Sequence, residues 1–366
     1  MKVLFAIATI IGTVIGAGVL GLPYAISVSG FIPGVILTLL IGFAMTMLLL
    51  YLGEVVLRCK EVYQLPGLVR KYLSKNSYRL TMVLFVLSIY GALISYTIGV
   101  SSSLVGNQTF YMFLFIGLMS IPILKGVHLM DKVQLIMISG LIIMIVIIGL
   151  SITPLISLDN LLMINPTQFF YPFGVIFFAL TGYSVMPELE QILLKEKKSF
   201  LPAVLIAMIA CTIIYLLFSA VFIGAFNGSI QQVATQSLSG SLGLLGTAIA
   251  VFGMTTSFMG LGVALSDMFK HDLGFSKVKS WGLTCLVPLL IAVLFKPDFI
   301  QPIQISGSYA GTITGFIIIA LWFKARKVRG VKPYFKAPFG LAGAVIVSVI
   351  LAMGLVMTTF SLFNLA

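Results

Sequence analysis

Residues Ile11-Gly12-Thr13-Val14-Ile15-Gly16-Ala17-Gly18-Val19-Leu20-Gly21-Leu22-Pro23 decide how this chain folds. They lie within an apolar run over residues 3–28, which at about 1.5 Å per residue is long enough to cross roughly 30 Å of hydrocarbon. The run nevertheless contains four glycines and a proline. Glycine costs about 1 kcal/mol relative to alanine inside a helix, so the pattern Gly16-x-Gly18-x-x-Gly21 predicts a point where a membrane helix opens.

An opened helix at membrane depth has two interpretations. Irregular backbone is tolerated there only where it is buried in protein or lines a cavity, and secondary transporters bind substrates with the backbone groups that such an opening frees. The alternative is close packing, in which Gly12, Thr13 and Gly16 let a second helix approach. This one segment does not decide between a binding site and a packing contact.

The composition is that of a polytopic membrane protein. Of the 366 residues 60% are apolar and only 9% are charged, and the mean hydropathy is +1.16, whereas soluble proteins contain about 25% charged residues. The net charge of +12 does not indicate a nucleic-acid partner, because the sequence has no polar domain that would present a basic surface. The lipid bilayer is therefore the expected surrounding of the chain.

Enzymatic and metal chemistry have little support in the sequence. His128 and His271 both fall in predicted loops, and no serine or cysteine has a base near it in the sequence. Cys59, Cys211 and Cys285 lack metal-ligand spacing and lie in or beside apolar runs. We therefore expect neither an enzyme nor a resident cofactor.

Apolar runs between polar breaks predict eleven membrane spans, and the distribution of charge orients them. On alternating sides of the membrane, 21 of the 22 lysines and arginines fall on one side and Lys296 falls on the other. The positive-inside rule then predicts a multi-pass protein of the cell membrane with a cytoplasmic N-terminus and an extracellular C-terminus. The predicted spans cover residues 3–28, 32–57, 80–105, 110–125, 132–154, 168–193, 200–226, 242–268, 279–296, 302–323 and 341–363.

A second interrupted span lies five spans after the first. The stretch Phe177-Phe178-Ala179-Leu180-Thr181-Gly182-Tyr183-Ser184-Val185-Met186-Pro187-Glu188 places glycine, hydroxyl residues and proline inside a hydrophobic run. Interrupted helices at corresponding positions of two halves are typical of transporters built from inverted repeats. The second break therefore favours a transporter over simple packing, and no ring of charges or filter-like repeat indicates a channel.

Three stretches resemble known permeases. The run Ile15-Gly16-Ala17-Gly18-Val19-Leu20-Gly21-Leu22-Pro23-Tyr24-Ala25, followed by Gly30 and Phe31, is similar to the first helix of the amino acid/auxin permease and bacterial aromatic amino acid permease families. These families belong to the amino acid–polyamine–organocation superfamily. The sixth span resembles the broken sixth helix of the same families at Phe178-Ala179-Leu180-Thr181-Gly182 and Pro187-Glu188, and Lys332-Pro333-Tyr334-Phe335-Lys336-Ala337-Pro338-Phe339-Gly340 is similar to a short loop of related permeases.

The resemblance implies an all-α fold of the LeuT type. Eleven transmembrane helices would form a five-plus-five inverted repeat plus one extra helix, with helices 1 and 6 broken at mid-membrane. The first repeat would cover residues 1–155, the second residues 156–325, and a basic loop with the last span residues 326–366. We expect such a chain to be a monomer.

The expected function is symport of a neutral, possibly aromatic, amino acid by alternating access. Free N–H groups at residues 16–19 would bind the α-carboxylate, and carbonyl groups at residues 178–181 would bind the ammonium. A membrane sensor or receptor that binds the amino acid without transporting it is the alternative on the same fold. The candidate substrate-binding residues are Ile15, Gly16, Ala17, Gly18, Val19, Tyr96, Phe178, Ala179, Leu180 and Thr181.

Sodium and protons are both candidate coupling ions. A carbonyl at Gly253, hydroxyls at Thr256 and Ser257, and carbonyls at Gly12 and Ile15 would supply five neutral oxygens, a set that resembles the sodium site of sodium-coupled LeuT-type proteins. Alternatively, the two hydroxyls bond back to carbonyls one turn earlier, as is common in membrane helices.

Two acidic residues are the candidates for proton coupling. Glu54 lies about one turn inside the end of span 2, and Glu188 follows Pro187 in span 6. An ionisable group within a span is costly and indicates function. The simpler interpretation of Glu54 is a side chain that reaches the membrane surface beside Arg58, four residues later.

Overall fold

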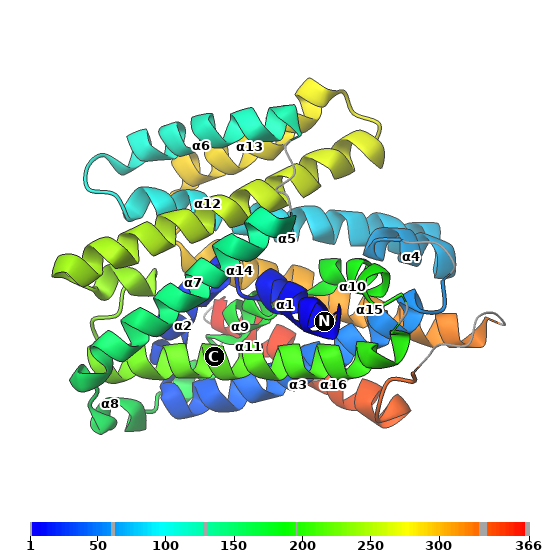
Figure 1. Cartoon of the computed structure of the whole chain (residues 1–366), viewed down its shortest axis with the longest axis horizontal. Helices are drawn as coiled ribbons and strands as arrows, with labels where there is room; N and C mark the ends of the chain where they lie inside the picture. Colours follow the sequence, from blue (N-terminus) through cyan, green and yellow to red (C-terminus); the bar gives the residue numbers. More distant parts are fainter. Residues whose placement is uncertain (1, 60–62, 127–130, 195, 329–334, 363–366) are drawn as a thin grey trace.

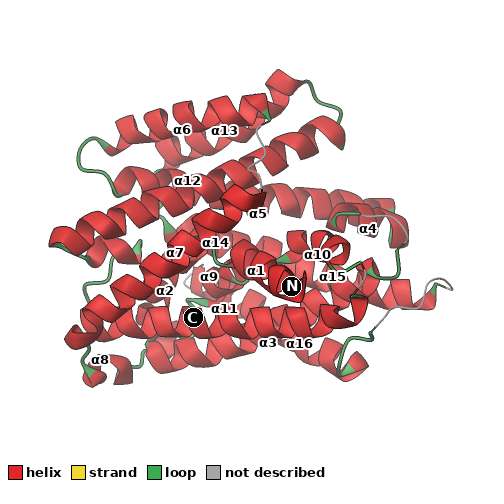
Figure 2. Cartoon of the chain, viewed as in Figure 1, coloured by secondary structure: helices red, strands yellow, loops and turns green. Residues whose placement is uncertain are grey.

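Helices make up almost the entire chain (Figure 2). The computed structural model describes residues 2–59, 63–126, 131–194, 196–328 and 335–362, so Lys332-Pro333-Tyr334 of the loop singled out in the sequence lie outside the described residues. The principal α-helices are α1 (Lys2–Val14), α2 (Leu22–Ser29), α3 (Phe31–Val56), α4 (Leu65–Tyr72), α5 (Lys75–Ser102), α6 (Gln108–Lys125), α7 (Asp131–Ile152), α8 (Leu158–Leu162), α9 (Phe173–Ala179), α10 (Met186–Ile192), α11 (Phe200–Phe226), α12 (Gly240–His271), α13 (Lys277–Phe295), α14 (Ile300–Ile305), α15 (Thr312–Lys327) and α16 (Gly340–Leu362).

The first span is broken at the predicted point. Helix α1 ends at Val14, and the chain resumes as a short 3₁₀ helix, η1 (Ala17–Gly21), that leads directly into α2. The two halves are bent by 48°. Gly16, at the junction, has an extended backbone with φ −115° and ψ −157°. The break predicted from the glycine pattern is therefore confirmed.

The sixth span is broken as well. Helix α9 ends at Ala179, and Thr181 and Gly182 are not helical. The chain then forms one turn of 3₁₀ helix, η4 (Tyr183–Val185), before α10 begins at Met186. The hydroxyl and glycine residues inside this apolar run thus mark a real interruption.

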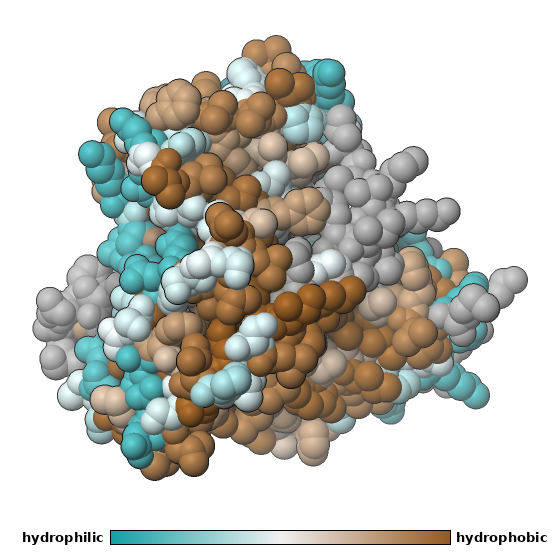
Figure 3. Space-filling model, turned by 60° about the vertical axis from the view of Figure 1, so that its left-hand side comes forward, coloured by the Kyte–Doolittle hydropathy of each residue, from teal (hydrophilic) through white to brown (hydrophobic). Residues whose placement is uncertain are grey.

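The chain is a multi-pass membrane protein. Eight helices of the described part are long and apolar enough to span a membrane, and the bent pair of α1 with η1 and α2 makes nine when it is counted as one span. Figure 3 shows a broad hydrophobic area over one face, with hydrophilic residues gathered along its left edge. Helix α7 occupies the expected fifth span, and the short helices α9 and α10 together occupy the expected sixth.

The helices form two groups with the breaks between them (Figure 1). Helices α5, α6, α12 and α13 contact one another in one group, while α1, α2 and α3 each contact α11 in the second. Helix α14 contacts α5 on one side and α9 on the other, and η1 contacts both α9 and α12. The interrupted backbone is therefore enclosed by both groups.

Contacts between loops agree with the sides of the membrane predicted from charge. The Gln236 side-chain amide donates to the hydroxyls of Ser102 and Ser103 at 3.0 and 2.9 Å. The Gln232 side-chain oxygen accepts from the backbone N–H of Phe299 at 2.8 Å. These contacts join the end of α5, the connection between α11 and α12, and the start of α14. All three segments are predicted to face the outside.

Helix α9 is packed unusually closely against the span that α14 and α15 form. In the span formed by α14 and α15, residues Ser306–Gly311 form a π-helical turn, η7. A Cβ atom added at Gly307 would overlap the carbonyl oxygen of Gly174, and one added at Gly174 would overlap the carbonyl oxygen of Gln304. Two glycines therefore let two backbones meet directly and fix the half-helix α9 in place.

This contact predicts a destabilised Gly307→Ala variant. The added methyl meets a backbone oxygen that cannot rotate away, and overpacking of this kind costs about 1–3 kcal/mol. Thermal unfolding of the purified protein in detergent measures the effect. Gly117→Ala on α6 is the matched control, because nothing lies within 4 Å of its added Cβ. Equal melting temperatures for the two variants would contradict the close contact.

Candidate functional site

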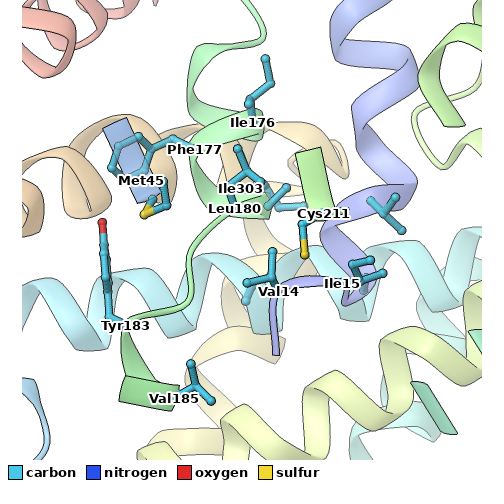
Figure 4. Packing of buried hydrophobic residues seen from close by; sticks show 14 of the residues in the cluster. Val14, Ile15, Met45, Ile176, Phe177, Leu180, Tyr183, Val185, Cys211 and Ile303 are labelled. Atoms are coloured by element: carbon cyan, nitrogen blue, oxygen red, sulfur yellow. The ribbon is translucent and has the colours of Figure 1, made fainter. Parts of the chain in front are cut away.

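The two broken spans touch each other at their breaks. A Cβ atom added at Gly18 would lie 3.2 Å from the Cα of Ala179, and one added at Gly182 would lie 3.1 Å from a methyl of Val14. Figure 4 shows Val14 near Leu180 within the buried cluster. The structure thus brings together the residues that the sequence predicted for substrate binding in spans 1 and 6.

The N-terminal end of the outer half of span 1 opens onto this junction. The 3₁₀ helix η1 begins at Ala17, and the N–H of Val19 donates to the carbonyl of Gly16 at 3.3 Å. The first N–H groups of a helical segment have no partner within it, and they carry the positive end of the helix dipole. The N–H of Gly16 donates to the Val14 carbonyl at 2.9 Å, so the N–H groups of Ala17 and Gly18 are the ones that present the kind of backbone end that binds a carboxylate.

Two carbonyl groups from the C-terminal ends of two half-helices converge on one side chain. Val14 is the last residue of α1, and Ala179 is the last residue of α9. The hydroxyl of Tyr215 lies 2.7 Å from the Val14 carbonyl oxygen and 3.0 Å from the Ala179 carbonyl oxygen. Helix C-termini carry partial negative charge, so two such ends meet at a single hydroxyl.

Tyr215 is a site residue that the sequence analysis missed. It lies in the middle of α11 and is fully buried, whereas the expected site involved spans 1, 3, 6 and 8. The available signal was its chemistry, since a tyrosine in the middle of an apolar span must find a partner for its hydroxyl. Its two partners lie 201 and 36 residues away in the sequence.

Tyr96 extends the polar contacts toward span 8. This residue of α5 is buried, and its hydroxyl is hydrogen-bonded to the side chain of Ser257 on α12. The Ser257 hydroxyl oxygen would lie 3.4 Å from a Cβ atom at Gly16. The predicted proximity of spans 1, 3, 6 and 8 is thus present in the structure.

Several of these residues are partly accessible. Gly16, Phe178, Thr181 and Ser257 are half-buried. Gly16 faces Ser257 and Gly18 faces Phe178, so partial exposure is shared by three spans at the junction of the breaks. The helix ends at Val14 and Ala179 lie deeper, with 3% of each residue exposed.

The predicted sodium ligands are distributed around the same junction. Gly12 and Ile15 are buried at the end of the inner half of span 1. The Thr256 hydroxyl donates to the Gly253 carbonyl at 3.0 Å, which is the back-bonded arrangement weighed in the sequence analysis. Ser257 is the member of the set that faces the break. A sodium site at these residues remains a prediction.

Glu54 accepts hydrogen bonds from five donors. Its first oxygen accepts from Arg58 Nη2 at 2.8 Å and from Arg326 Nε at 2.9 Å. Its second oxygen accepts from Trp322 Nε1 at 2.8 Å, Arg326 Nη2 at 2.9 Å and the backbone N–H of Ala337 at 2.9 Å. The carboxylate is fully buried. It joins the end of α3 to the end of α15 and to the connection that precedes α16.

Both carboxylate oxygens of Glu54 already accept hydrogen bonds, which favours an anchoring role for this residue over proton coupling. Protonation would remove the charge that pairs with two arginines, and a buried ion pair that loses one charge is strongly destabilising. The other predicted acid, Glu188, is exposed on α10. Two residues later, Glu190 is buried and pairs with Lys197 at 3.2 Å.

Comparison with known proteins places this geometry in context. A model of the tryptophan/tyrosine permease family matches residues 1–361. Glutamine transporter 2 of Aliivibrio fischeri is 23% identical over 86% of each chain. The tryptophan-specific transport protein of Pseudomonas aeruginosa is 25% identical over 92% of this chain and 89% of its own. The tyrosine-specific transport system 1 of Haemophilus influenzae is 24% identical over 88% of each.

The anchoring role of Glu54 predicts that Glu54→Gln unfolds at a lower temperature than the wild type. We expect a loss on the order of 3 kcal/mol, at the lower end for a broken buried pair because the Arg326 side chain is 29% exposed. Glu196→Gln, at an exposed acid, is the control. An unchanged melting temperature combined with an altered pH dependence of uptake would instead make Glu54 a proton carrier.

Proposed function

The chain belongs to the tryptophan/tyrosine permease family, and on that premise we propose that it is a symporter of a neutral, aromatic amino acid. The observation that carries this proposal is the meeting of the two breaks. One helix end with free N–H groups and two helix ends with carbonyl groups lie at the same junction. An α-amino acid has the complementary pair of charges.

The proposed binding mode uses only the main chain for the charged groups of the substrate. The α-carboxylate would bind the N–H groups of Ala17 and Gly18, and the ammonium would bind carbonyl groups at the end of α9, beginning with Ala179. Charged side chains are absent from residues 3–53 and 160–187, the stretches that contain both breaks. Main-chain dipoles are therefore the chemistry available there for binding a zwitterion.

An aromatic substrate side chain suits the surroundings of the junction. Phe178 is half-buried next to Gly18, and Tyr96 lies on the facing helix α5. Aromatic rings supply large apolar contacts with few rotatable bonds. Two of the relatives are named for tryptophan and tyrosine and one for glutamine. We propose tryptophan or tyrosine as the substrate and treat glutamine as a competitor to be measured.

The architecture we propose is the five-plus-five inverted repeat of the LeuT type, within the amino acid–polyamine–organocation superfamily. The repeats would cover residues 1–155 and 156–325, and residues 326–366 would add the final span. The two groups of helices with the breaks between them support this assignment. Alternating access would then move one group against the other around the substrate. The N-terminus would be cytoplasmic and the C-terminus extracellular, and the chain would act as a monomer.

Sodium is the coupling ion that we favour. Ser257 faces the break in span 1, which brings span 8 to the place where Gly12 and Ile15 end the inner half-helix. Carbonyl and hydroxyl oxygens are suitable ligands for a hard cation. A proton would need a titrating carboxylate near the site, and Glu54 is held in its five hydrogen bonds at the far end of α3.

Uptake of radiolabelled amino acids into proteoliposomes tests the proposal. At constant pH we expect accumulation of tryptophan or tyrosine that depends on an inward sodium gradient and stops when choline replaces sodium. Thr256→Ala should raise the sodium concentration needed for half-maximal uptake, because it removes a ligand oxygen. Thr247→Ala, nearer the outer end of α12, is the control.

Three other results of the uptake experiment would contradict different parts of the proposal. Full uptake in choline with dependence on a proton gradient would remove sodium and restore the proton alternative. Saturable binding without flux in either gradient or in exchange would make the chain a sensor. Neither binding nor flux for any amino acid in the panel would overturn the proposed function itself.

A further inference from the structure

We propose that the Tyr215 hydroxyl is part of the amino-acid site, where it accepts a hydrogen bond from the substrate ammonium while it donates to the carbonyl of Val14. This inference rests on the proposed function and adds a side chain from span 7 to a site otherwise formed by main-chain groups. It makes Tyr215 a determinant of selectivity for ligands that carry an α-amino group.

The Tyr215 hydroxyl has one proton but lies beside two acceptors. A phenolic hydroxyl donates a single hydrogen bond and offers lone pairs as an acceptor. The Tyr215 oxygen nevertheless lies at donor distance from two carbonyl oxygens, at 2.7 Å from Val14 and at 3.0 Å from Ala179. The shorter distance favours donation to Val14, whose carbonyl oxygen also accepts from the N–H of Gly16 at 2.9 Å. The Ala179 carbonyl and the lone pairs of the hydroxyl are then left to bind another donor.

An ammonium group provides what this arrangement lacks. It has three donors and no acceptor, so it can donate to the Ala179 carbonyl and to the Tyr215 oxygen at the same time. Hydrogen bonds from a charged donor are roughly twice as strong as those between neutral groups. The partial negative charges at the ends of α1 and α9 add to the attraction.

The segments that carry these oxygens contain no acidic side chain that would compete with them for the ammonium group. Residues 3–53, 160–187 and 200–226 include both breaks and all of α11, and they contain no aspartate, glutamate, lysine or arginine. The cation must therefore be stabilised by neutral oxygens, and each of them contributes a large share.

The test compares an amino acid with the same molecule lacking its amino group. Binding of L-tryptophan and of 3-(indol-3-yl)propionate, and of the corresponding tyrosine pair, is measured on the purified full-length protein. In Tyr215→Phe we expect the affinity for the amino acid to fall at least tenfold, as for the loss of a hydrogen bond to a charged group. The affinity for the analogue without the amino group should not change.

A second substitution separates binding from folding. Replacing Tyr215 with 4-aminophenylalanine retains N–H donors for both carbonyls but leaves a poor acceptor, so the protein should remain as stable as the wild type and still lose affinity for the amino acid. Tyr90→Phe is the matched control, because its hydroxyl donates to the Leu283 carbonyl at 3.0 Å, on helix α13 and away from the breaks. We expect wild-type selectivity in that variant.

The outcomes are distinguishable. Wild-type selectivity between amino acid and analogue in folded Tyr215→Phe, or in the 4-aminophenylalanine variant, would overturn the inference and leave the proposed function standing. An equal loss of affinity for both ligands would also overturn it, because a purely structural tyrosine acts on both alike. Absence of amino-acid binding by the wild type would overturn the proposed function, and this inference with it.

Discussion

The structure depends on one constraint, which is that backbone N–H and C=O groups inside a membrane must find partners within the protein. Each interrupted helix frees such groups inside an apolar span. Here the interruptions meet, and part of the freed backbone is satisfied by Tyr215, whose hydroxyl reaches the ends of both α1 and α9. A zwitterionic ligand can form hydrogen bonds with those of the freed backbone groups that have no partner in the protein. The backbone groups that the two breaks expose are therefore the groups that we propose to bind the ligand.

The same constraint explains the buried carboxylate at the other end of α3. Glu54 is fully buried, and its two carboxylate oxygens accept hydrogen bonds from donors in α3, α15 and the segment before α16. Trp322 contributes a hydrogen bond to Glu54 and a ring that lies under the Arg326 guanidinium at 4.1 Å. The charge therefore acts as a fixed junction between helices, while the ligand site that we propose at the breaks relies on neutral groups.

Sequence reasoning predicted the elements but only part of their contacts. Glycine spacing located the break at Gly16, and hydroxyl residues within an apolar run located the one at Gly182, because local backbone cost is visible in local sequence. Arg58 was predicted beside Glu54 and pairs with it, but Tyr215 and the distant partners of Glu54 were missed for a different reason. Arg326 lies 272 residues from Glu54, and apolar periodicity does not specify which helices meet. For Thr256 the sequence left two interpretations, a sodium ligand or a hydroxyl bonded to a carbonyl one turn earlier. The structure shows the hydroxyl bonded to the Gly253 carbonyl.

The central claim is that an amino acid binds where the two breaks meet, and protection of an introduced thiol tests it most directly. In a chain whose three native cysteines have been replaced, Phe178→Cys places a thiol at the junction, and Ser239→Cys places one on the exposed connection before α12. The account predicts that L-tryptophan or L-tyrosine slows alkylation at position 178 in proportion to its occupancy and leaves position 239 unaffected. Equal alkylation rates at position 178 with and without a saturating, demonstrably bound amino acid would place the site elsewhere.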